Sequence, residues 1–325
     1  MSGLPAVVVT GGAGFIGSHV CTALAEAGHR VVAVDDLSTG SADNLVGVPE
    51  VDLVVADVAA PGLVDVLRSV GAGVVCHLAA AIDVRASVAD PVADATRNVV
   101  GTVAVLQAAV AAGVGKVVFA SSGGSIYGAA TPPPVAEDAE IAPESPYAAS
   151  KAAAELWLQT FRRLHGLRWT ALALANVYGP RQDPAGEAGV ISLFADALLA
   201  GRSTTIYGDG SQTRDFVHVG DVAAAFRAAS GELAEDCRLN IGTGVETSVR
   251  ELHTLLAGLC DAPDRPATAA ARAGELQRSA LDARRARAVL GWTPQVPLAE
   301  GLAGTVEWIG SRASVSALRG PEGPR

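Results

Sequence analysis

Positive charge is scarce in this sequence of 325 residues. Lysine and arginine together number 24 against 34 aspartate and glutamate residues, which gives a formal net charge of −10. The only lysines are Lys116 and Lys151. Binding to nucleic acid needs a cationic face that neutralises phosphates. The composition therefore argues against nonspecific nucleic-acid binding.

Cysteine and histidine are sparse and scattered. The four cysteines form no CxxC pair, so the sequence suggests neither a disulfide framework nor a cysteine zinc site. The six histidines lie on different segments, without the HxxxH or HExxH spacing of metal-binding helices. We therefore expect no metal site.

The N-terminal segment has no basic stretch before its first apolar run, unlike a secretory signal. We interpret 1–12 as leading into a first buried strand and expect a cytoplasmic protein. The apolar segment 98–115 is interrupted by Asn98, Gln107 and glycines. This favours a buried crossover helix followed by a strand over a membrane span.

Short runs of β-branched residues alternate with long segments rich in alanine and leucine. The runs are 6–10, 30–35, 52–57, 73–80 and 116–122. Apolar strands separated by helical segments are typical of a parallel sheet covered on both faces. We therefore predict an α/β fold with a doubly wound parallel sheet of Rossmann type.

The alternation weakens after Asn176, where the chain becomes richer in glycine and proline. We predict a first domain over 1–175 and a smaller lobe over 176–312 that is interleaved with the sheet. This lobe would close over the strand ends, where open α/β sheets bind ligands. The segment 313–325 lacks periodicity and is predicted to be a mobile tail.

Glycines recur at 11, 14 and 17, where the first predicted strand turns into a helix. There Gly11 permits a tight turn, Gly14 lets the backbone approach a pyrophosphate, and Gly17 allows the helix to pack on the sheet. The second predicted strand ends in Asp35, followed by Asp36, at the separation where a carboxylate reaches an adenosine ribose hydroxyl. Since a carboxylate would repel a 2′-phosphate, the pattern favours NAD over NADP.

Tyr147 and Lys151 follow Pro146 at i and i+4, so they share one face of a predicted helix. An unperturbed tyrosine has a pKa of about 10 and is a poor base at neutral pH. A neighbouring ammonium favours the phenolate, and a nicotinamide cation would add to the effect. Because lysine is otherwise nearly absent, the pair indicates a catalytic base rather than a surface helix pair.

Further motifs accompany this pair: HLAA at 77–80, SSGGSIYG at 121–128, YAASK at 147–151 and TRDFVHVGDV from Thr213. With TGGAGFIG at 10–17, they resemble the extended short-chain dehydrogenase/reductase family, and within it the NAD-dependent nucleotide-sugar epimerases and dehydratases. The similarity covers nearly the whole chain and is greatest to UDP-glucose 4-epimerases.

This resemblance implies NAD as the cofactor and a UDP-sugar as the substrate. The residues that would bind NAD lie at the glycine turn, at strand ends or on the catalytic helix: Gly11, Gly14, Phe15, Ile16, Gly17, Asp35, Asp36, Leu37, Ser38, Thr39, Gly40, Asp57, Val58, Leu78, Ala79, Ala80, Asn98, Ser121, Tyr147, Lys151 and Ala175. The residues that would bind the sugar nucleotide lie in the catalytic segment and the second lobe: Ser122, Ser125, Tyr147, Asn176, Gly189, Val190, Ile191, Ile206, Tyr207, Arg214, Arg272 and Ser279. Among them, Arg214 and Arg272 would clamp the diphosphate. The segment 189–191 and the pair Ile206 and Tyr207 would line the uracil pocket, although their apolar side chains could equally belong to the core.

The resemblance also implies the chemistry. Tyr147 would take the proton from the sugar O4 while the C4 hydrogen leaves as hydride to tightly bound NAD, and the planar 4-keto sugar would turn over before hydride returns. The hydroxyl that commonly assists falls at Gly123 here, so Ser122 or Ser125 must supply that hydrogen bond, with Ser122 ranked first. The Asp-Glu pair of the dehydratases falls at Gly124 and Ser125, which disfavours elimination of water.

The physiological sugar stays open at this point. Where some relatives carry a tyrosine that narrows the sugar pocket, this chain places Ser279, which leaves room for the N-acetyl group of UDP-N-acetylglucosamine. UDP-glucuronate is another alternative because Arg85 could reach its carboxylate, although an ion pair with Asp83 is the simpler interpretation. A non-catalytic NAD-binding regulatory protein is a third alternative, against which the tyrosine–lysine pair argues.

The resemblance finally implies a homodimer, since the family commonly pairs two helices per subunit. The alanine-rich segments 91–112 and 148–163 have the apolar character for this. Small residues let helices approach closely.

Overall fold

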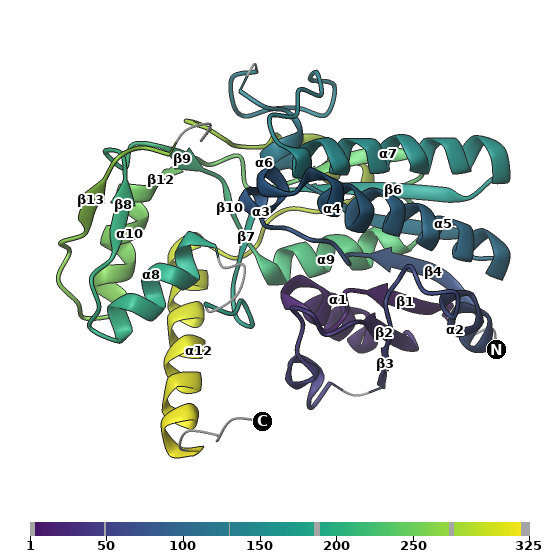
Figure 1. Cartoon of the computed structure of the whole chain (residues 1–325), viewed down its shortest axis with the longest axis horizontal. Coiled ribbons are helices and arrows are strands. Elements are labelled where there is room, and N and C mark those ends of the chain that lie inside the picture. The colour runs from purple at the N-terminus through teal and green to yellow at the C-terminus, as the bar shows by residue number, and fades with distance from the viewer. Residues whose placement is uncertain (1–3, 49, 130, 185–188, 273–275, 320–325) are drawn as a thin grey trace.

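The computed structural model describes residues 4–48, 50–129, 131–184, 189–272 and 276–319. Figure 1 shows a larger part built around a sheet, with a smaller part beside it. The first described strand belongs to the sheet, whereas the last described element is the long helix of the smaller part.

Seven parallel strands form the central sheet. They are β1 (Ala6–Thr10), β2 (Val31–Asp35), β3 (Val51–Val55), β4 (Ala72–His77), β5 (Lys116–Ser121), β6 (Arg168–Leu174) and β11 (Cys237–Ile241). Their order in space is β11-β6-β5-β4-β1-β2-β3, which confirms the predicted doubly wound α/β sheet. The order reverses between β1 and β4, and ligands bind outside the carboxyl ends of the strands at such a point.

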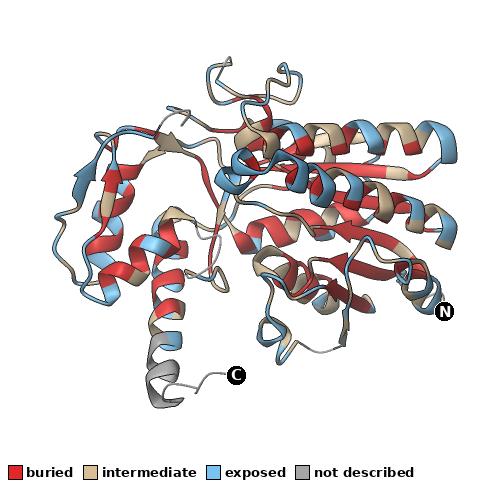
Figure 2. Cartoon of the chain, in the orientation of Figure 1, coloured by how far each residue is buried: buried red, intermediate tan, exposed pale blue. Residues whose placement is uncertain are grey.

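Helices cover both faces of the sheet, as Figure 2 shows by the buried residues along it. One face carries α1 (Phe15–Glu26), α9 (Val219–Ser230) and α11 (Arg284–Leu290), and the other carries α2 (Leu63–Val70), α5 (Gly101–Ala112) and α7 (Pro146–His165). Side chains alternate along a strand. Accordingly, Val7 and Val9 belong to one apolar cluster with Phe226 of α9, while Val8 belongs to the other with Leu106 of α5.

Short elements fill the connections of the sheet. They are η1 (Ala42–Leu45), α3 (Val84–Ala89), α4 (Pro91–Ala95), a π turn (Thr96–Val100) and α6 (Gly123–Ile126). A π turn inside a helical segment is rare and is frequently found at functional sites. The segment from α4 through α5 is therefore a candidate part of a functional site.

The smaller lobe has an apolar cluster of its own, which includes Phe194, Leu252 and Leu302. Its elements are three helices and three strand pairs: α8 (Val190–Leu199), α10 (Val249–Leu259), α12 (Leu298–Arg319), β7 (Asn176–Tyr178) with β10 (Phe216–His218), β8 (Thr205–Tyr207) with β13 (Ala267–Ala269), and β9 (Thr213–Arg214) with β12 (Thr247–Ser248). Between these elements the chain returns to the sheet with α9 and β11. On this basis we propose that the first domain ends at residue 175 and that the second lobe is interleaved with the sheet.

Helix α12 continues to Arg319, so residues 313–319 of the predicted tail are helical, and the mobility of 313–325 stays a prediction. Val306 and Ile309 anchor the preceding turns in the core of the lobe. Extending a helix that is already formed fixes one residue for each hydrogen bond gained, so it costs little. Residues 320–325 lie outside the described part of the chain.

The continuous helical segment Pro91–Ala112 is, in the described chain, the one long and apolar enough to cross a membrane by length and composition. Its second half, α5, packs on the sheet and fully buries Val105, Leu106 and Ala109. This packing agrees with the predicted crossover helix.

The core assignment can be tested at Phe226, which is fully buried on α9. We expect Phe226→Ala to lower the free energy of unfolding by about 3–5 kcal/mol, because it removes buried apolar surface and leaves a cavity. Chemical denaturation measures the change. Leu233→Ala, at a side chain that is 74% exposed, is the control. It should change the free energy by less than about 0.5 kcal/mol, and equal losses in the two variants would contradict the assignment.

Candidate active site

The glycine turn lies between the carboxyl ends of β1 and β4. Gly11 has a φ of +69°, and a Cβ there would lie 2.7 Å from the backbone nitrogen of Ala79 in the loop after β4. A Cβ at Gly17 would overlap the carbonyl oxygen of Gly11. Only glycine fits at either position, because the start of α1 packs directly on the turn. The structure thus supports the predicted roles of Gly11 and Gly17.

Helix α1 begins without a side-chain cap. Its N-cap is Gly14, which offers no side-chain acceptor, and the first turn has no acidic residue. The backbone N–H groups of Phe15 and Ile16 therefore lack a side-chain cap, and an uncapped helix N-terminus attracts a phosphate group. These residues fit the pyrophosphate of a dinucleotide.

Asp35 ends β2 beside this turn and is buried. Its carboxylate accepts hydrogen bonds from the backbone N–H groups of Ala13 and Leu37, each at 2.9 Å. Gly40 also lies close, since a Cβ there would be 2.8 Å from Asp35 Oδ1. The carboxylate thus closes the turn and has the position expected of a ribose ligand. Asp36, Ser38 and Thr39 follow it in exposed positions.

The other predicted cofactor residues follow neighbouring strands. Leu78, Ala79 and Ala80 come after β4, Ser121 ends β5, Ala175 follows β6, and Asp57 and Val58 follow β3. Because these strands are parallel, their carboxyl ends share one edge of the sheet. Asp57 is exposed and accepts a hydrogen bond from the N–H of Ala59, so it also forms a local turn.

Asn98 is buried in the π turn, and its side chain is already engaged. The amide Nδ2 donates to the Ala81 carbonyl oxygen at 2.9 Å and to Asp94 Oδ1 at 2.8 Å, while Oδ1 accepts from the N–H of Ala81 at 2.9 Å. Both amide hydrogens are therefore used. Asn98 orients the loop after β4, and both hydrogens of its side-chain amide are already donated, so a contact of Asn98 with the cofactor, which stays a prediction, would use another atom of the residue.

Tyr147 and Lys151 lie on the first turns of α7. Ser145 caps this helix by accepting a hydrogen bond from the N–H of Ala148, and Pro146 occupies the first turn. Lys151 Nζ lies 5.8 Å from the centroid of the Tyr147 ring and donates to the Ala120 carbonyl oxygen at 2.9 Å. The predicted arrangement of a cation beside a phenol is therefore present.

Burial lowers the pKa of Lys151 to about 8, against the carboxylates of Asp94 and Glu155, which raise it. Asp94 accepts hydrogen bonds from Ser150 Oγ at 2.6 Å and from Asn98. The sequence analysis did not find Asp94, because it lies on another helix and only the fold brings it to Lys151. Glu155 could have been found from the sequence, since it is the only acidic residue of α7 and lies at i+4 from Lys151.

His77 of the HLAA motif is a neutral structural residue. Burial lowers its pKa to about 3, with the Lys151 charge adding to the effect. Its ring nitrogens contact Thr10 Oγ1 at 2.7 Å and Thr102 Oγ1 at 3.1 Å. Thr102 Oγ1 donates its hydrogen to the Asn98 carbonyl oxygen. In the contact between His77 Nε2 and Thr102 Oγ1, His77 must therefore be the donor. His77 thereby joins β1 to the first turn of α5.

The segment 122–125, called the serine loop here, includes the first residues of the short helix α6. A Cβ at Gly123 would lie 2.5 Å from Leu281 Cδ1 and 3.0 Å from the Ala173 carbonyl oxygen, so a side chain there would have to displace Leu281. Ser125 Oγ donates to Ser122 Oγ at 2.8 Å. Ser125 Oγ also lies 3.3 Å from the Ser122 carbonyl oxygen, and the higher rank of Ser122 as the assisting hydroxyl stays a prediction.

The substrate residues are only partly brought together. A Cβ at Gly124 would lie 3.6 Å from Asn176 Oδ1, which places Asn176 beside the serine loop. Arg272 stacks over the ring of Tyr207, with 3.9 Å between the guanidinium carbon and the ring centroid. Arg214 Nη1 donates to the carbonyl oxygens of Thr213 and Leu276, both at 2.8 Å.

The remaining substrate residues belong mostly to the body of the smaller lobe. Gly189 and Val190 start α8, and Ser279 is half-buried in the segment before Ala280. Ile191 and Ile206 are buried in the lobe core with 1% and 2% exposure. Their side chains do not line an open pocket, so the core interpretation is correct for both, and only their backbones could contact a ligand.

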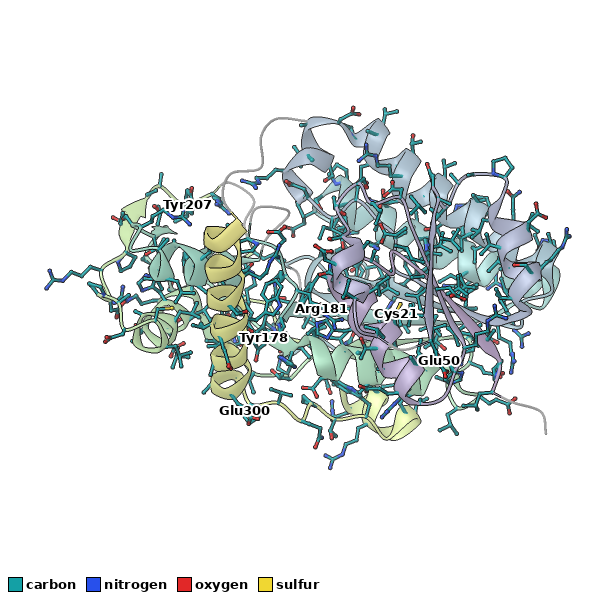
Figure 3. The ribbon with its side chains drawn as sticks, turned by 90° about the horizontal axis from the view of Figure 1, so that it is seen from below. Cys21, Glu50, Tyr178, Arg181, Tyr207 and Glu300 are labelled. Carbon is teal, nitrogen blue, oxygen red and sulfur yellow. The ribbon has the colours of Figure 1, made fainter. Side chains whose placement is uncertain are left out.

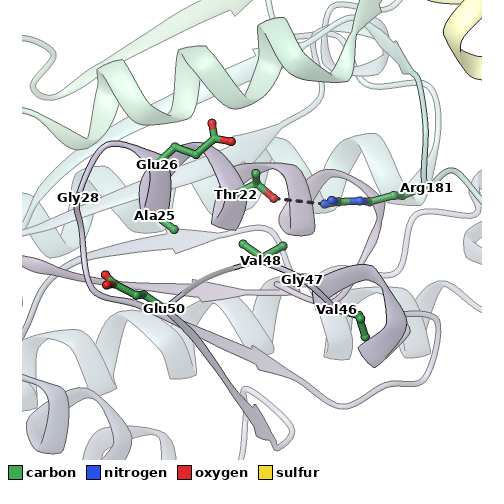
Figure 4. A pocket seen from close by; sticks show the side chains of 9 residues that line it. All are labelled: Thr22, Ala25, Glu26, Gly28, Val46, Gly47, Val48, Glu50 and Arg181. Carbon is green, nitrogen blue, oxygen red and sulfur yellow. Dashed lines mark hydrogen bonds between the residues drawn. The ribbon is translucent and has the colours of Figure 1, made fainter.

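Two cavities lie away from Tyr147. The first, of about 460 Å³, is lined by α1 and the loop after η1, with Arg181 at one end, where its Nη1 donates to Thr22 Oγ1 (Figure 4). Figure 3 shows Cys21 and Glu50 on the sheet part, Tyr207, Tyr178 and Glu300 on the smaller lobe, and Arg181 between them. The second, of about 850 Å³, lies beside α7 and the amino ends of β6 and β11. Neither contains the tyrosine–lysine pair, so the chemistry rather than the cavity volume identifies the site.

Within the described ranges, no group of histidine, cysteine, aspartate or glutamate side chains could hold a metal ion.

Comparisons with known proteins agree with this geometry. The model of the NAD-dependent epimerase/dehydratase family matches residues 7–242. A UDP-glucose 4-epimerase of Mycolicibacterium smegmatis is 54% identical over 311 residues, which cover 94% of this chain and 99% of that protein. The structure of a UDP-glucose 4-epimerase of Thermotoga maritima with UDP-glucose is 39% identical, with a TM-score of 0.91 and coverage of 95% of this chain and 99% of that one.

A UDP-glucose 4-epimerase of Thermus thermophilus, solved in complex with NAD, is 40% identical, with a TM-score of 0.87 and coverage of 93% and 98% of the two chains. With a family match over residues 7–242 and relatives aligned over nearly its whole length, the chain belongs to the NAD-dependent epimerase/dehydratase family and uses NAD as its cofactor.

Proposed function

We propose that this chain is a UDP-glucose 4-epimerase that interconverts UDP-galactose and UDP-glucose through a 4-keto intermediate. One observation carries the proposal: the Tyr147–Lys151 pair lies on α7, which packs against α6, and the serine loop has no carboxylate at Gly124 or Ser125. Such a site can move one proton and one hydride at a secondary alcohol. It lacks the acid–base pair needed to eliminate water, which argues against a dehydratase.

Tyr147 is the proposed base and acid of the reaction. As the phenolate, it would take the proton from the sugar O4, and Lys151 would favour that form through its charge. Ser122 would donate a hydrogen bond to the same oxygen as it becomes a ketone. When bound, NAD supplies the chemistry of hydride acceptance from C4 and hydride return. Tyr147 would then give its proton back to the other epimer, so no net oxidation results.

The diphosphate of the substrate would be held by Arg214 and Arg272. Planar guanidinium groups bind phosphate oxygens in two places at once. Tyr207 would contact the uracil, since it is 37% exposed and already stacks with Arg272. Asn176 would contact the diphosphate or the sugar beside the serine loop.

The choice of sugar is the finer part of the proposal. Ser279 is small, so UDP-N-acetylglucosamine is the first alternative substrate. UDP-glucuronate is supported less, because Arg85, its candidate carboxylate ligand, lies 3.7 Å from Asp83 in an ion pair. A non-catalytic NAD-binding regulator is the least supported alternative, since it has no need of a phenolate beside the nicotinamide.

We also propose a cytoplasmic homodimer. The outer surface of the segment from α3 to the π turn and of α7 exposes large apolar side chains, namely Val84, Val88, Val92, Val100, Leu156 and Trp157. Apolar patches of this kind on adjacent helices favour pairing with a second copy.

The role of Tyr147 is tested by Tyr147→Phe. This change should lower kcat by roughly 10²- to 10⁴-fold while NAD stays bound, because it removes only the hydroxyl that transfers the proton. Turnover and the NAD released on denaturation are measured together. Tyr178→Phe, which removes a buried hydroxyl in the core of the smaller lobe, is the matched control and should keep its activity. Unchanged turnover in Tyr147→Phe would remove this residue from the mechanism.

The substrate is tested by proton NMR of the anomeric region during separate incubations with UDP-galactose, UDP-N-acetylgalactosamine and UDP-glucuronic acid. We expect UDP-galactose to convert fastest, to a mixture dominated by UDP-glucose. Faster conversion of UDP-N-acetylgalactosamine would assign the alternative substrate. No conversion of any of the three with added NAD would contradict the epimerase proposal.

The dimer is tested by sedimentation velocity. Trp157→Glu places a charge in the exposed apolar surface of α7 and should shift the protein from dimer to monomer. Leu255→Glu, at a similarly exposed position on α10, should leave the dimer intact. A wild-type protein that sediments only as a monomer would refute the proposal.

A further inference from the structure

Helix α7 docks on the end of β5 through two successive contacts. Lys151 Nζ donates to the Ala120 carbonyl oxygen at 2.9 Å, and one turn later Glu155 Oε1 accepts from Ser121 Oγ at 2.5 Å. Tyr147, Lys151 and Glu155 follow one another at i, i+4 and i+8, so they form one stripe of the helix. Along the strand, the next residue after Ser121 is Ser122, the proposed hydrogen-bond donor to the sugar.

Glu155 also forms an ion pair through its other carboxylate oxygen. Glu155 is 2% exposed, and its Oε2 accepts from Arg238 Nε at 2.7 Å and from Arg238 Nη2 at 2.6 Å. Arg238 lies on β11, the edge strand next to β6. If the carboxylate moved away, the partly buried guanidinium would lose its only charged partner in this ion pair. The pair therefore fixes α7 against two strands at once.

We propose that Glu155 is a positioning residue for the Tyr147–Lys151 pair. It locks α7 to the end of β5, which sets the separation of Tyr147 and Ser122, and it holds a carboxylate one helical turn from the Lys151 ammonium. The expected change in kcat rests on the proposed function, whereas the expected change in the Tyr147 titration does not.

The charges around Lys151 give the direction of the expected effect. Asp94 faces it from α4, Glu155 from α7 and His77 from β4, and His77 is neutral because burial lowers its pKa to about 3. Burial also lowers the pKa of Lys151 to about 8, so removal of the Glu155 charge would lower it further and leave less ammonium at neutral pH. Tyr147 would then lose part of the cation that favours its phenolate, and its own pKa would rise.

The direct effect of the Glu155 charge on the phenolate has the opposite sign but is smaller. Glu155 lies two helical turns from Tyr147 and one from Lys151, and charge interactions weaken with distance. The midpoint of the Tyr147 titration is therefore expected to move upward.

The experiment uses the full chain loaded with NAD and the variant Glu155→Gln. The difference in tyrosinate absorbance between each protein and its Tyr147→Phe counterpart isolates this phenol among the 4 tyrosines. We expect the titration midpoint to rise by roughly 0.5–1 pH unit. We also expect kcat for UDP-galactose to fall about tenfold or more, with KM nearly unchanged, because misplaced groups slow the chemical step.

Arg162→Gln is the matched control. Arg162 also forms an ion pair from α7, with Nε 2.6 Å from Oδ2 of Asp236, directly before β11, although this pair is more exposed than that of Glu155. It lies farther along the helix from Lys151, so its loss should cost stability and leave both the midpoint and kcat in place. An equal shift in Arg162→Gln would reduce Glu155 to a general structural role and overturn the proposal.

A second variant guards against a folding failure of Glu155→Gln. The double change Glu155→Gln/Arg238→Gln leaves no buried charge unpaired and should give the same upward shift. An unshifted midpoint in whichever of these two variants folds overturns the proposal. If the wild-type chain converts no UDP-galactose, the proposed function fails, but the titration needs no substrate and still decides the role of Glu155.

Discussion

The active site is organised around one buried ammonium group. Lys151 is 5% exposed, and a charged amine in such a place loses most of its hydration. Its stabilisation comes from the Ala120 carbonyl oxygen and from the carboxylates of Asp94 and Glu155. These three groups belong to β5, α4 and α7, so the cation is supported only once the sheet and both helices have assembled. The fold and the ability to favour a phenolate at Tyr147 therefore depend on the same contacts.

The cofactor side of the site is built on a different physical basis. There the decisive feature is the lack of side chains at Gly11 and Gly17, which lets the glycine turn and the start of α1 pack in direct contact. The uncapped N–H groups of α1 supply partial positive charge without any cationic side chain. A protein that is poor in lysine can bind an anionic dinucleotide in this way, and it can reserve its buried ammonium for the chemistry.

Local features could be predicted from the sequence, and long-range contacts could not. The strand runs, the glycine turn and the spacing of Tyr147 and Lys151 need only the periods of a strand and a helix, and the structure contains all of them. Asp94 could not be predicted as a neighbour of Lys151, because no local pattern says which helices meet. Nor can the sequence separate a pocket-lining isoleucine from a core one, as Ile191 and Ile206 illustrate, since both roles use the same apolar spacing.

The segment 276–281 connects the proposed sugar pocket to the serine loop. Its Leu276 carbonyl oxygen accepts a hydrogen bond from Arg214, the proposed diphosphate ligand, and its Leu281 fills the space beside Gly123. Ser279 lies between these two contacts, in the same short stretch of backbone. A larger side chain at Ser279 would press on a segment that is held at both ends, so it would displace the serine loop as well as narrow the pocket. If the proposed roles of Ser279 and Ser122 hold, sugar preference and the placement of the assisting hydroxyl would both depend on this one segment, which would make specificity and rate interdependent.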